Sequence, residues 1–328
     1  MSTETQAQTT TLGRSGLEVS PIAFGTWQLG GDWGEIDRDE AKAAIRRALD
    51  LGINFFDTAQ AYGFGKSEQL LAEALGDDIR RDDVIVATKG GLRPVDDGIE
   101  RDSSADWLRS GVEESLRHLG VETIDLYQVH WPDPEVSPWE TGKALAQLKE
   151  QGKIRHVGVS NFSPEEMSEL SRTVEVETLQ PPYHLFRREI EADVLPWCQE
   201  NGVGVLVYGP LAHGLLSGRF DAETELPEDD WRSGSDLFSG ENFQRNLQAV
   251  DQLREFAESR GWTLPQLGVA WTLAHPAVDV SIVGGRRPDH IEGVAPAAEI
   301  ELTEKDLAEI DDIMESAVQV AGPSPESV

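Results

Sequence analysis

Four residues with ionisable side chains stand at or just after the ends of strand-like segments in this chain: Asp57, Tyr62, Lys89 and His130. The segments INFFDTAQAYG, VIVATKG and LYQVHW are rich in β-branched and aromatic residues, which is typical of buried strands. A chain that repeatedly places titratable groups at strand C-termini is typical of a parallel barrel with its active site on one rim. A carboxylate, a phenol, an ammonium and an imidazole together suit proton-coupled hydride chemistry at a carbonyl group.

Carbonyl reduction needs a hydride donor on one face of the carbonyl and a proton donor at its oxygen. Tyr62 is the candidate general acid, because an ammonium such as Lys89 favours the phenolate and eases release of the proton. Asp57 is expected to orient Lys89, and His130 to donate a hydrogen bond to the developing alkoxide. The alternative, judged from the residues alone, is a structural ion pair between Asp57 and Lys89 with Tyr62 as a loop aromatic.

Strand-like segments recur along the chain and alternate with segments of helical periodicity. Helices are predicted over 37–51, 104–119, 138–151 and 303–316, with others beginning at Ser163 and covering 189–200. Asp37 is expected to cap the first of these, with Glu40 completing a capping box. Eight strands are predicted, over 22–24, 53–56, 84–88, 124–129, 156–159, 174–179, 203–207 and 280–283.

Eight strands alternating with helices predict an α/β fold, a (β/α)8 TIM barrel. Residues 10–20 read as an N-terminal β-hairpin with its turn at 13–16, which would cover the bottom of the barrel. The Gly-, Asp- and Ser-rich stretch 209–241 is a long loop after strand 7, of the kind that forms lids and binding loops. We expect a single barrel over 11–320, a disordered lead over 1–10 and a disordered tail over 321–328.

The composition restricts the function further. The chain has 328 residues, with 60 Asp and Glu against 28 Lys and Arg, and a formal net charge of −32. Such a charge argues against nucleic-acid binding, which needs a basic footprint. No apolar run approaches the length of a membrane span, and no secretory signal is recognised, so we expect a cytoplasmic protein without a membrane partner. Cys198, the single cysteine, is expected to be a structural thiol on a helix.

Eight motifs occur in the order and spacing of one known family. They are FGTWQLGG, FFDTAQAYGFGKSEQLL, ATKGG, VHWPDP, HVGVSNFS, QPPYHLFRR, GVLVYGPLAHGLLSGRF and SIVGGRRPDHIE. From about Leu12 to Ile313, the chain resembles the aldo-keto reductases, NAD(P)H-dependent oxidoreductases with a TIM barrel. The resemblance implies a reversible reduction of aldehydes or ketones to alcohols, with catalytic roles for Asp57, Tyr62, Lys89 and His130. It implies a small carbonyl or alcohol compound as the partner. No metal is expected, because His130 lacks His or carboxylate partners at ligand spacing and the paired-His signatures of metal barrels are absent.

The resemblance also implies contacts around the four catalytic residues. Trp27 and Trp131 match positions that line the substrate pocket, although core packing is the ordinary role of a tryptophan. Tyr208 matches the aromatic on which the nicotinamide ring stacks. The remaining positions that match cofactor contacts are Thr26, Ser160, Asn161, Gln180, Pro210, Leu211, His213, Arg219, Arg232, Gly284, Arg286 and His290.

The cofactor expected from the resemblance is NADPH, with NADH as the alternative. An arginine such as Arg286 in a glycine loop before a short helix can fork onto a 2′-phosphate, although two solvated arginines on an acidic surface are the plainer interpretation. The chain departs from the family where the adenine is contacted, because those places hold His290, Gly293 and Val294. This departure predicts looser adenosine binding.

Three other functions compete with the reductase. A non-catalytic barrel that binds NADPH and regulates a partner is disfavoured because His130, altered in such relatives, is present. A sugar-specific dehydrogenase running oxidatively is compatible with the loop sequences. A barrel hydrolase or isomerase is disfavoured by the four catalytic candidates and by the arginines of the last loop.

The acidic composition also resembles that of proteins from halophiles that accumulate salt, since only seven of the 28 cationic residues are lysines. An ordinary acidic cytosolic protein is the alternative. On the halophile hypothesis the melting temperature should rise from dilute buffer to molar KCl, because salt screens the self-repulsion of the surface. A melting temperature that falls steadily over that range, measured by thermal scanning, would contradict the hypothesis.

Overall fold

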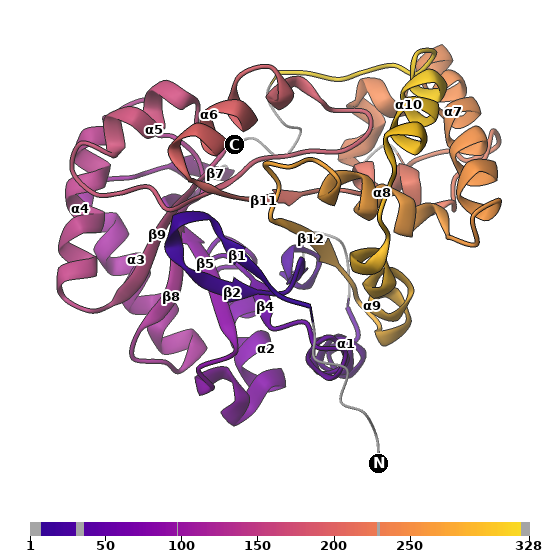
Figure 1. The fold of residues 1–328 in the computed structure, drawn as a ribbon. Coiled ribbons are helices and arrows are strands. Elements are labelled where there is room, and N and C mark those ends of the chain that lie inside the picture. The colour runs from indigo at the N-terminus through magenta and orange to yellow at the C-terminus, as the bar shows by residue number, and fades with distance from the viewer. Residues whose placement is uncertain (1–7, 31–35, 97, 228–229, 323–328) are drawn as a thin grey trace.

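Eight parallel strands close into a barrel in the computed structural model, which describes residues 8–30, 36–96, 98–227 and 230–322 (Figure 1). The ring closes where β12 pairs with β3, for example Val283 opposite Phe24. The predicted (β/α)8 barrel is therefore confirmed. Its strands are β3 (Ile22–Gly25), β4 (Phe55–Asp57), β5 (Ile85–Gly90), β8 (Ile124–Val129), β9 (Ile154–Ser160), β10 (Thr178–Gln180), β11 (Gly204–Tyr208) and β12 (Val280–Gly284).

Helices surround the barrel and shield the outer faces of its strands (Figure 1). The first begins where predicted, because the Asp37 carboxylate accepts hydrogen bonds from the amides of Asp39 and Glu40. The predicted return bond from Glu40 is not formed there. The helices are α1 (Arg38–Asp50), α2 (Lys66–Leu75), α3 (Ala105–Leu119), α4 (Pro138–Glu150), α5 (Pro164–Leu170), α6 (Val194–Asn201), α7 (Gly240–Glu258), α8 (Leu264–Leu273), α9 (Pro288–Val294) and α10 (Glu304–Met314).

Most of the core forms two separate layers. One fills the barrel interior and includes Phe55, Leu126 and Leu206, all fully buried. The other lies between the strands and the helices and includes Ile45, Leu145 and much of the remaining apolar sequence. Strands buried on both faces explain why their sequences are nearly continuous apolar runs.

The N-terminal hairpin closes one end of the barrel, as predicted. It consists of β1 (Thr10–Leu12) and β2 (Leu17–Val19), and its Leu12 and Val19 side chains join the interior core. At Gly13 the backbone has a φ of 48°, and an added Cβ would lie 2.1 Å from the amide nitrogen of Gly204. Only glycine allows so close an approach to the start of β11.

Three predicted elements differ from the structure. Residues 174–177 are not a strand: the Val174 amide bonds back to Leu170 at the end of α5, so β10 is confined to Thr178–Gln180. Residue 53 belongs to the turn after α1, because its amide bonds to the Ala48 carbonyl. The helix predicted over 189–200 is broken, since the Asp193 side chain caps a new helix at Val194.

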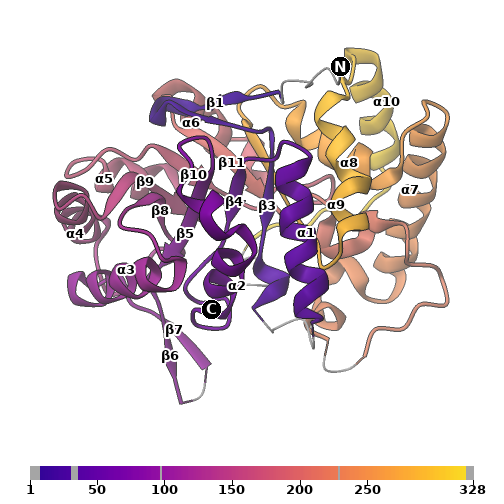
Figure 2. The same cartoon turned by 90° about the horizontal axis from the view of Figure 1, so that it is seen from below.

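One hairpin lies outside the predicted pattern, and the predicted long loop after β11 contains short helical turns. A second hairpin, β6 (Leu92–Val95) and β7 (Gly98–Arg101), follows β5 and projects from the end of the barrel opposite to β1 and β2 (Figure 2). The long loop after β11 contains short 3-10 turns at Ala212–Ser217, Trp231–Gly234 and Asp236–Phe238.

The predicted lead and tail fall largely on residues 1–7 and 323–328, which lie outside the described residues. None of the helices in the described part of the chain has the length and apolar content that a membrane crossing requires.

Candidate active site

Lys89 lies at the centre of a polar cluster at the C-terminal ends of the strands. Its side chain is fully buried, and its Nζ lies 2.6 Å from Asp57 Oδ1, 3.0 Å from the Thr58 carbonyl oxygen and 3.2 Å from the Tyr62 hydroxyl. These three acceptors match the three donors of an ammonium group. Burial lowers the pKa of Lys89, while the charge and the hydrogen bond of Asp57 oppose that shift. The geometry therefore favours a charged lysine that holds the phenol oxygen.

The Asp57 carboxylate is held by groups from three other strands. Its second oxygen, Oδ2, accepts hydrogen bonds from Gln128 Nε2 at 3.2 Å and Gln180 Nε2 at 2.9 Å. Asp57 ends β4, Lys89 lies in β5, Gln128 in β8 and Gln180 in β10. A carboxylate with only 3% of its side chain exposed thus has charged and neutral donors on both oxygens.

Tyr62 and His130 face one another across the mouth of this cluster. Their ring centroids are 5.7 Å apart and the rings meet edge to face. Burial, and next the charge of Lys89, hold the pKa of His130 well below its ordinary value. A neutral imidazole carries one N–H, which suits hydrogen-bond donation to an oxygen.

The ends of β9 and β11 continue the same rim. Asn161 follows β9 with a φ of 64°, and its side chain connects the ends of β8 and β11. Its Nδ2 donates to the His130 carbonyl at 3.1 Å, and its Oδ1 accepts from the Tyr208 hydroxyl at 3.0 Å. Ser160 Oγ donates to the Gln180 carbonyl at 2.8 Å. The structure therefore brings Ser160, Asn161 and Tyr208 together beside the catalytic candidates.

Cationic side chains gather around His290 at the start of α9. Arg219 Nη2 and Arg287 Nη2 each lie 3.3 Å from His290 Nε2, and the Arg286 amide lies 3.4 Å from its Nδ1. Burial lowers the pKa of His290, the neighbouring Asp289 opposes that effect, and the arginines reinforce it. Such a concentration of positive charge on an acidic chain suits a polyanionic ligand.

A family model described as "Aldo/keto reductase family" matches residues 21–315. The chain belongs to this family. The aldo-keto reductase YhdN of Bacillus subtilis (strain 168) is 40% identical over 311 residues, which cover 94% of this chain and 94% of that protein.

Two solved structures agree with this assignment. The glycerol dehydrogenase AKR11B4 from Gluconobacter oxydans matches with a TM-score of 0.87 at 40% identity, covering 94% of this chain and 95% of that chain. The holo form of the aldo-keto reductase AKR11C1 from Bacillus halodurans matches with a TM-score of 0.78 at 31% identity, covering 95% and 98%.

Some residues proposed for cofactor contact have their polar groups engaged within the reductase itself. Thr26 is fully buried, with its Oγ1 bonded to the Asp57 carbonyl and to Ser67. Gln180 uses its amide group on Asp57, as described above. Arg232 forms a bidentate pair with Asp230 and donates to the His213 carbonyl. The others border the same loops: Pro210, Leu211 and His213 follow β11, and Gly284 ends β12.

Sequence reasoning missed Gln128 and Trp231. Gln128 lies in β8, whose six residues are all buried. A side-chain amide in such a buried strand was the signal that could have marked it as a functional residue. Trp231 lies in the long loop and packs against His213, with ring centroids 4.9 Å apart, and against Trp27 at 6.5 Å. Trp231 thus lies beside Trp27, one of the two tryptophans expected to line the substrate pocket. Sequence reasoning missed it because its position depends on how the long loop folds.

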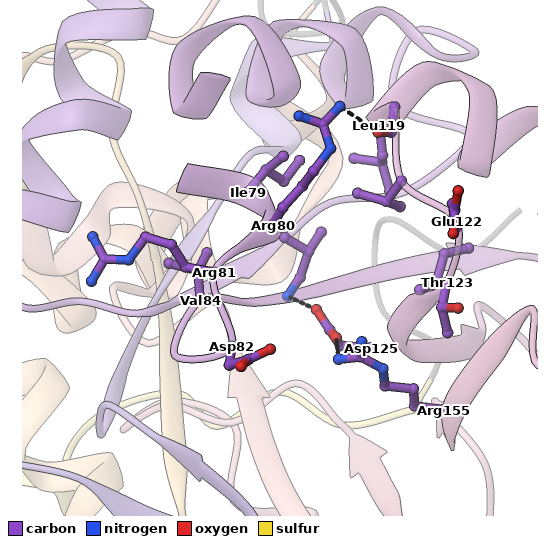
Figure 3. A pocket seen from close by; sticks show the side chains of 14 residues that line it. Ile79, Arg80, Arg81, Asp82, Val84, Leu119, Glu122, Thr123, Asp125 and Arg155 are labelled. Atoms are coloured by element: carbon purple, nitrogen blue, oxygen red, sulfur yellow. Dashed lines mark hydrogen bonds and ion pairs between the residues drawn. The ribbon is translucent and has the colours of Figure 1, made fainter. Parts of the chain in front are cut away.

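Figure 3 shows a cavity of about 410 Å³ beside the starts of β5, β8 and β9. The four catalytic candidates stand instead at or after the strand ends. The walls of the cavity come from segments that precede β5 and β8 and from Arg155 near the start of β9. Asp125 spans this region, because Oδ1 pairs with Arg155 at 2.7 Å and Oδ2 accepts from the Val86 amide at 3.0 Å. The cavity thus borders an ion pair that ties strand starts together.

A buried glutamate on α2 connects the tyrosine loop to the barrel. Glu68 is fully buried; its Oε1 accepts from Thr88 Oγ1 at 2.7 Å, and its Oε2 lies 3.0 Å from His118 Nδ1. The His118 ring packs on Gly65, where a Cβ would lie 2.2 Å from ring Cε1. Thr88 directly precedes Lys89, and Gly65 follows Tyr62 by three residues. The Glu68–His118 pair, called the latch below, therefore supports the positions of both Lys89 and Tyr62.

The latch predicts a pH-dependent stability. The hydrogen bond with Glu68 raises the pKa of His118, and the charges of Glu68 and Glu114 add to this rise. Burial and the charge of Arg117 oppose it. Because the folded pKa is raised, the stabilisation is fully present below about pH 6.5 and is lost as pH rises through the folded value. The stability advantage of wild type over His118→Gln, measured by urea unfolding, should shrink as the pH rises above about 6.5. A constant or growing advantage would refute the latch.

Proposed function

We propose that this chain reduces aldehydes and ketones reversibly at the expense of NAD(P)H, with Tyr62 as the general acid. The observation that carries the proposal is the position of Lys89 Nζ, 2.6 Å from Asp57 and 3.2 Å from the Tyr62 hydroxyl. An ammonium at that distance stabilises the phenolate that remains after the proton has been given to the substrate.

The direction of the tyrosine proton follows from the same contact. Because Lys89 donates to the phenol oxygen, the Tyr62 O–H can donate its own proton to the carbonyl oxygen of the substrate. His130, whose ring lies beside that of Tyr62, donates its N–H to the same substrate oxygen as negative charge develops there. Burial keeps His130 neutral, so the proton comes from Tyr62 rather than from the imidazole.

The residues on the rim fit a nicotinamide dinucleotide. Such a cofactor, when bound, supplies or accepts the hydride. Ser160, Asn161 and Tyr208 would hold the nicotinamide end, since their polar groups converge beside His130. Arg219, Arg286, Arg287 and His290 would hold the phosphate groups at the other end, and the forked guanidinium of Arg286 favours NADP over NAD.

The other candidate functions have less support. A regulatory barrel without catalysis does not need the Asp57–Lys89–Tyr62 geometry, which is fully assembled. An alcohol dehydrogenase uses the same groups in reverse, and the Gluconobacter structure is named for that direction. We therefore describe the reaction as reversible and its substrate as a small carbonyl compound or the matching alcohol.

Removing the phenolic oxygen should separate catalysis from binding. Tyr62→Phe should lower kcat by ~10²–10⁴-fold, the usual contribution of a positioned proton donor, and leave the NADPH dissociation constant unchanged. Turnover of 4-nitrobenzaldehyde in ~2 M KCl, followed by NADPH absorbance, measures the first quantity, and quenching of tryptophan fluorescence the second.

Tyr183→Phe is the matched control. The Tyr183 ring packs against Trp271, and its hydroxyl donates a hydrogen bond to Glu191. Because these contacts involve none of the four catalytic candidates, kcat should stay at the wild-type value. Full activity in Tyr62→Phe would overturn the assignment of the general acid.

Cofactor preference provides a second test. Arg286→Ala should weaken NADPH binding by about 10–100-fold, the range expected for a lost charge-assisted hydrogen bond, and change NADH binding by less than about 2-fold. Calorimetric titration with both cofactors measures the difference. Equal losses for NADPH and NADH would place the 2′-phosphate elsewhere.

A further inference from the structure

The β6–β7 hairpin is inserted between β5, which carries Lys89, and helix α3. Figure 2 shows it projecting from the end of the barrel. Its strands are antiparallel, with Leu92 opposite Arg101 and Arg93 opposite Glu100. A two-stranded hairpin is marginally stable by itself, so its contacts with the barrel decide what it does.

One face of the hairpin packs over the active-site rim. Leu92, Ile99 and Arg101 share that face, because side chains alternate along each strand, and Arg93 and Glu100 point the other way, toward solvent. Leu92 is 4% exposed and forms a small cluster with Ala61 and Trp131, against which Ile99 packs. Ala61 directly precedes Tyr62, and Trp131 directly follows His130, so the hairpin spans both catalytic loops.

Polar contacts fasten the base of the hairpin to the Trp131 segment. The Arg101 guanidinium carbon lies 5.1 Å from the centre of the Trp131 ring, and its Nη1 donates to the Pro132 carbonyl at 3.1 Å. The Ser103 amide donates to Asp133 Oδ2 at 2.7 Å. From α3, Trp107 Nε1 donates to the Leu92 carbonyl at 3.1 Å. The hairpin therefore covers Trp131 with the Leu92 and Ile99 side chains and with the Arg101 guanidinium.

We propose that the inner face of this hairpin is the element that determines which carbonyl substrates the enzyme accepts by size. Leu92, Ile99 and Arg101 are positioning residues: they fix the Trp131 indole, and the indole limits the space beside Tyr62 and His130. The inference rests on the proposed reductase function. A fixed wall holds a small carbonyl compound in reacting geometry and excludes a bulky one.

The test compares two faces of the same hairpin. Ile99→Ala and Arg101→Ala remove contacts to the Trp131 wall, whereas Arg93→Ala and Glu100→Ala are matched controls on the solvent face. The readout is the ratio of kcat/KM for 2-naphthaldehyde to that for propanal, with NADPH as the donor. The inner-face variants should raise this ratio by about 10-fold or more, and the controls should stay within about 2-fold of wild type.

A measurement without turnover tests the positioning directly. In protein labelled with 5-fluorotryptophan, the Trp131 resonance is assigned by its loss in Trp131→Phe. It should shift or broaden in Arg101→Ala and stay unchanged in Glu100→Ala. If an inner-face variant folds poorly, Ile99→Val and Arg101→Lys should show the same changes to a smaller degree.

The possible failures are distinguishable. Wild-type turnover with an unchanged substrate ratio and an unchanged Trp131 resonance in the inner-face variants would overturn the role of the hairpin and leave the reductase function standing. Absence of wild-type turnover on any carbonyl compound would overturn both.

Discussion

The buried ion pair between Lys89 and Asp57 is the interaction on which the rest of the site depends. Moving two charges out of water costs several kcal/mol per ion, and their attraction offsets this only where the remaining hydrogen-bonding capacity is filled. Here Lys89 donates to three acceptors, and Asp57 accepts from Lys89, Gln128 and Gln180. These groups come from β4 and the loop after it, and from β5, β8 and β10. The barrel register is therefore constrained, since a shift of one residue would turn these side chains to the opposite face.

This arrangement explains the division between the two ends of the barrel. At the end closed by β1 and β2, the interior is apolar and includes Leu12 and Val19. At the opposite end, polar and ionisable groups replace the apolar layer and are held by one another. The cationic cluster around His290 extends this polar rim. Its local charge is positive, although the net charge of the whole chain is −32. Most other ion pairs lie on the surface, where each contributes little to stability.

Much of this architecture could be predicted from the sequence, because it depends on local signals. Seven of the eight barrel strands lie within a few residues of their predicted positions, since buried strands read as apolar runs, and the N-terminal hairpin follows from its glycines. The four catalytic candidates could be named because each stands at a strand end or in the loop after it. Val174 and Val176 misled the prediction of β10, because β-branched residues also occur in the segment that leads from a helix to a strand.

The remaining features depend on contacts between distant residues. Gln128 looks like one polar residue in a strand until Asp57 and Gln180 are placed beside it. The segment Leu92–Arg101 contains a proline and several charges, which weaken the strand signal, and its fold is decided by Trp131 and Trp107. Trp231 reaches Trp27 only through the path of the long loop. In each case the information lies in packing across the rim of the barrel.

The most direct test of the account is a double-mutant cycle on kcat/KM for NADPH-dependent reduction, using Asp57→Asn, Lys89→Met and the double variant. If Asp57 acts only through Lys89, each single substitution should lower kcat/KM, and the double variant should lose no more than Lys89→Met alone. Losses that multiply, in variants that still bind NADPH, would show that the two residues act independently and would contradict the account.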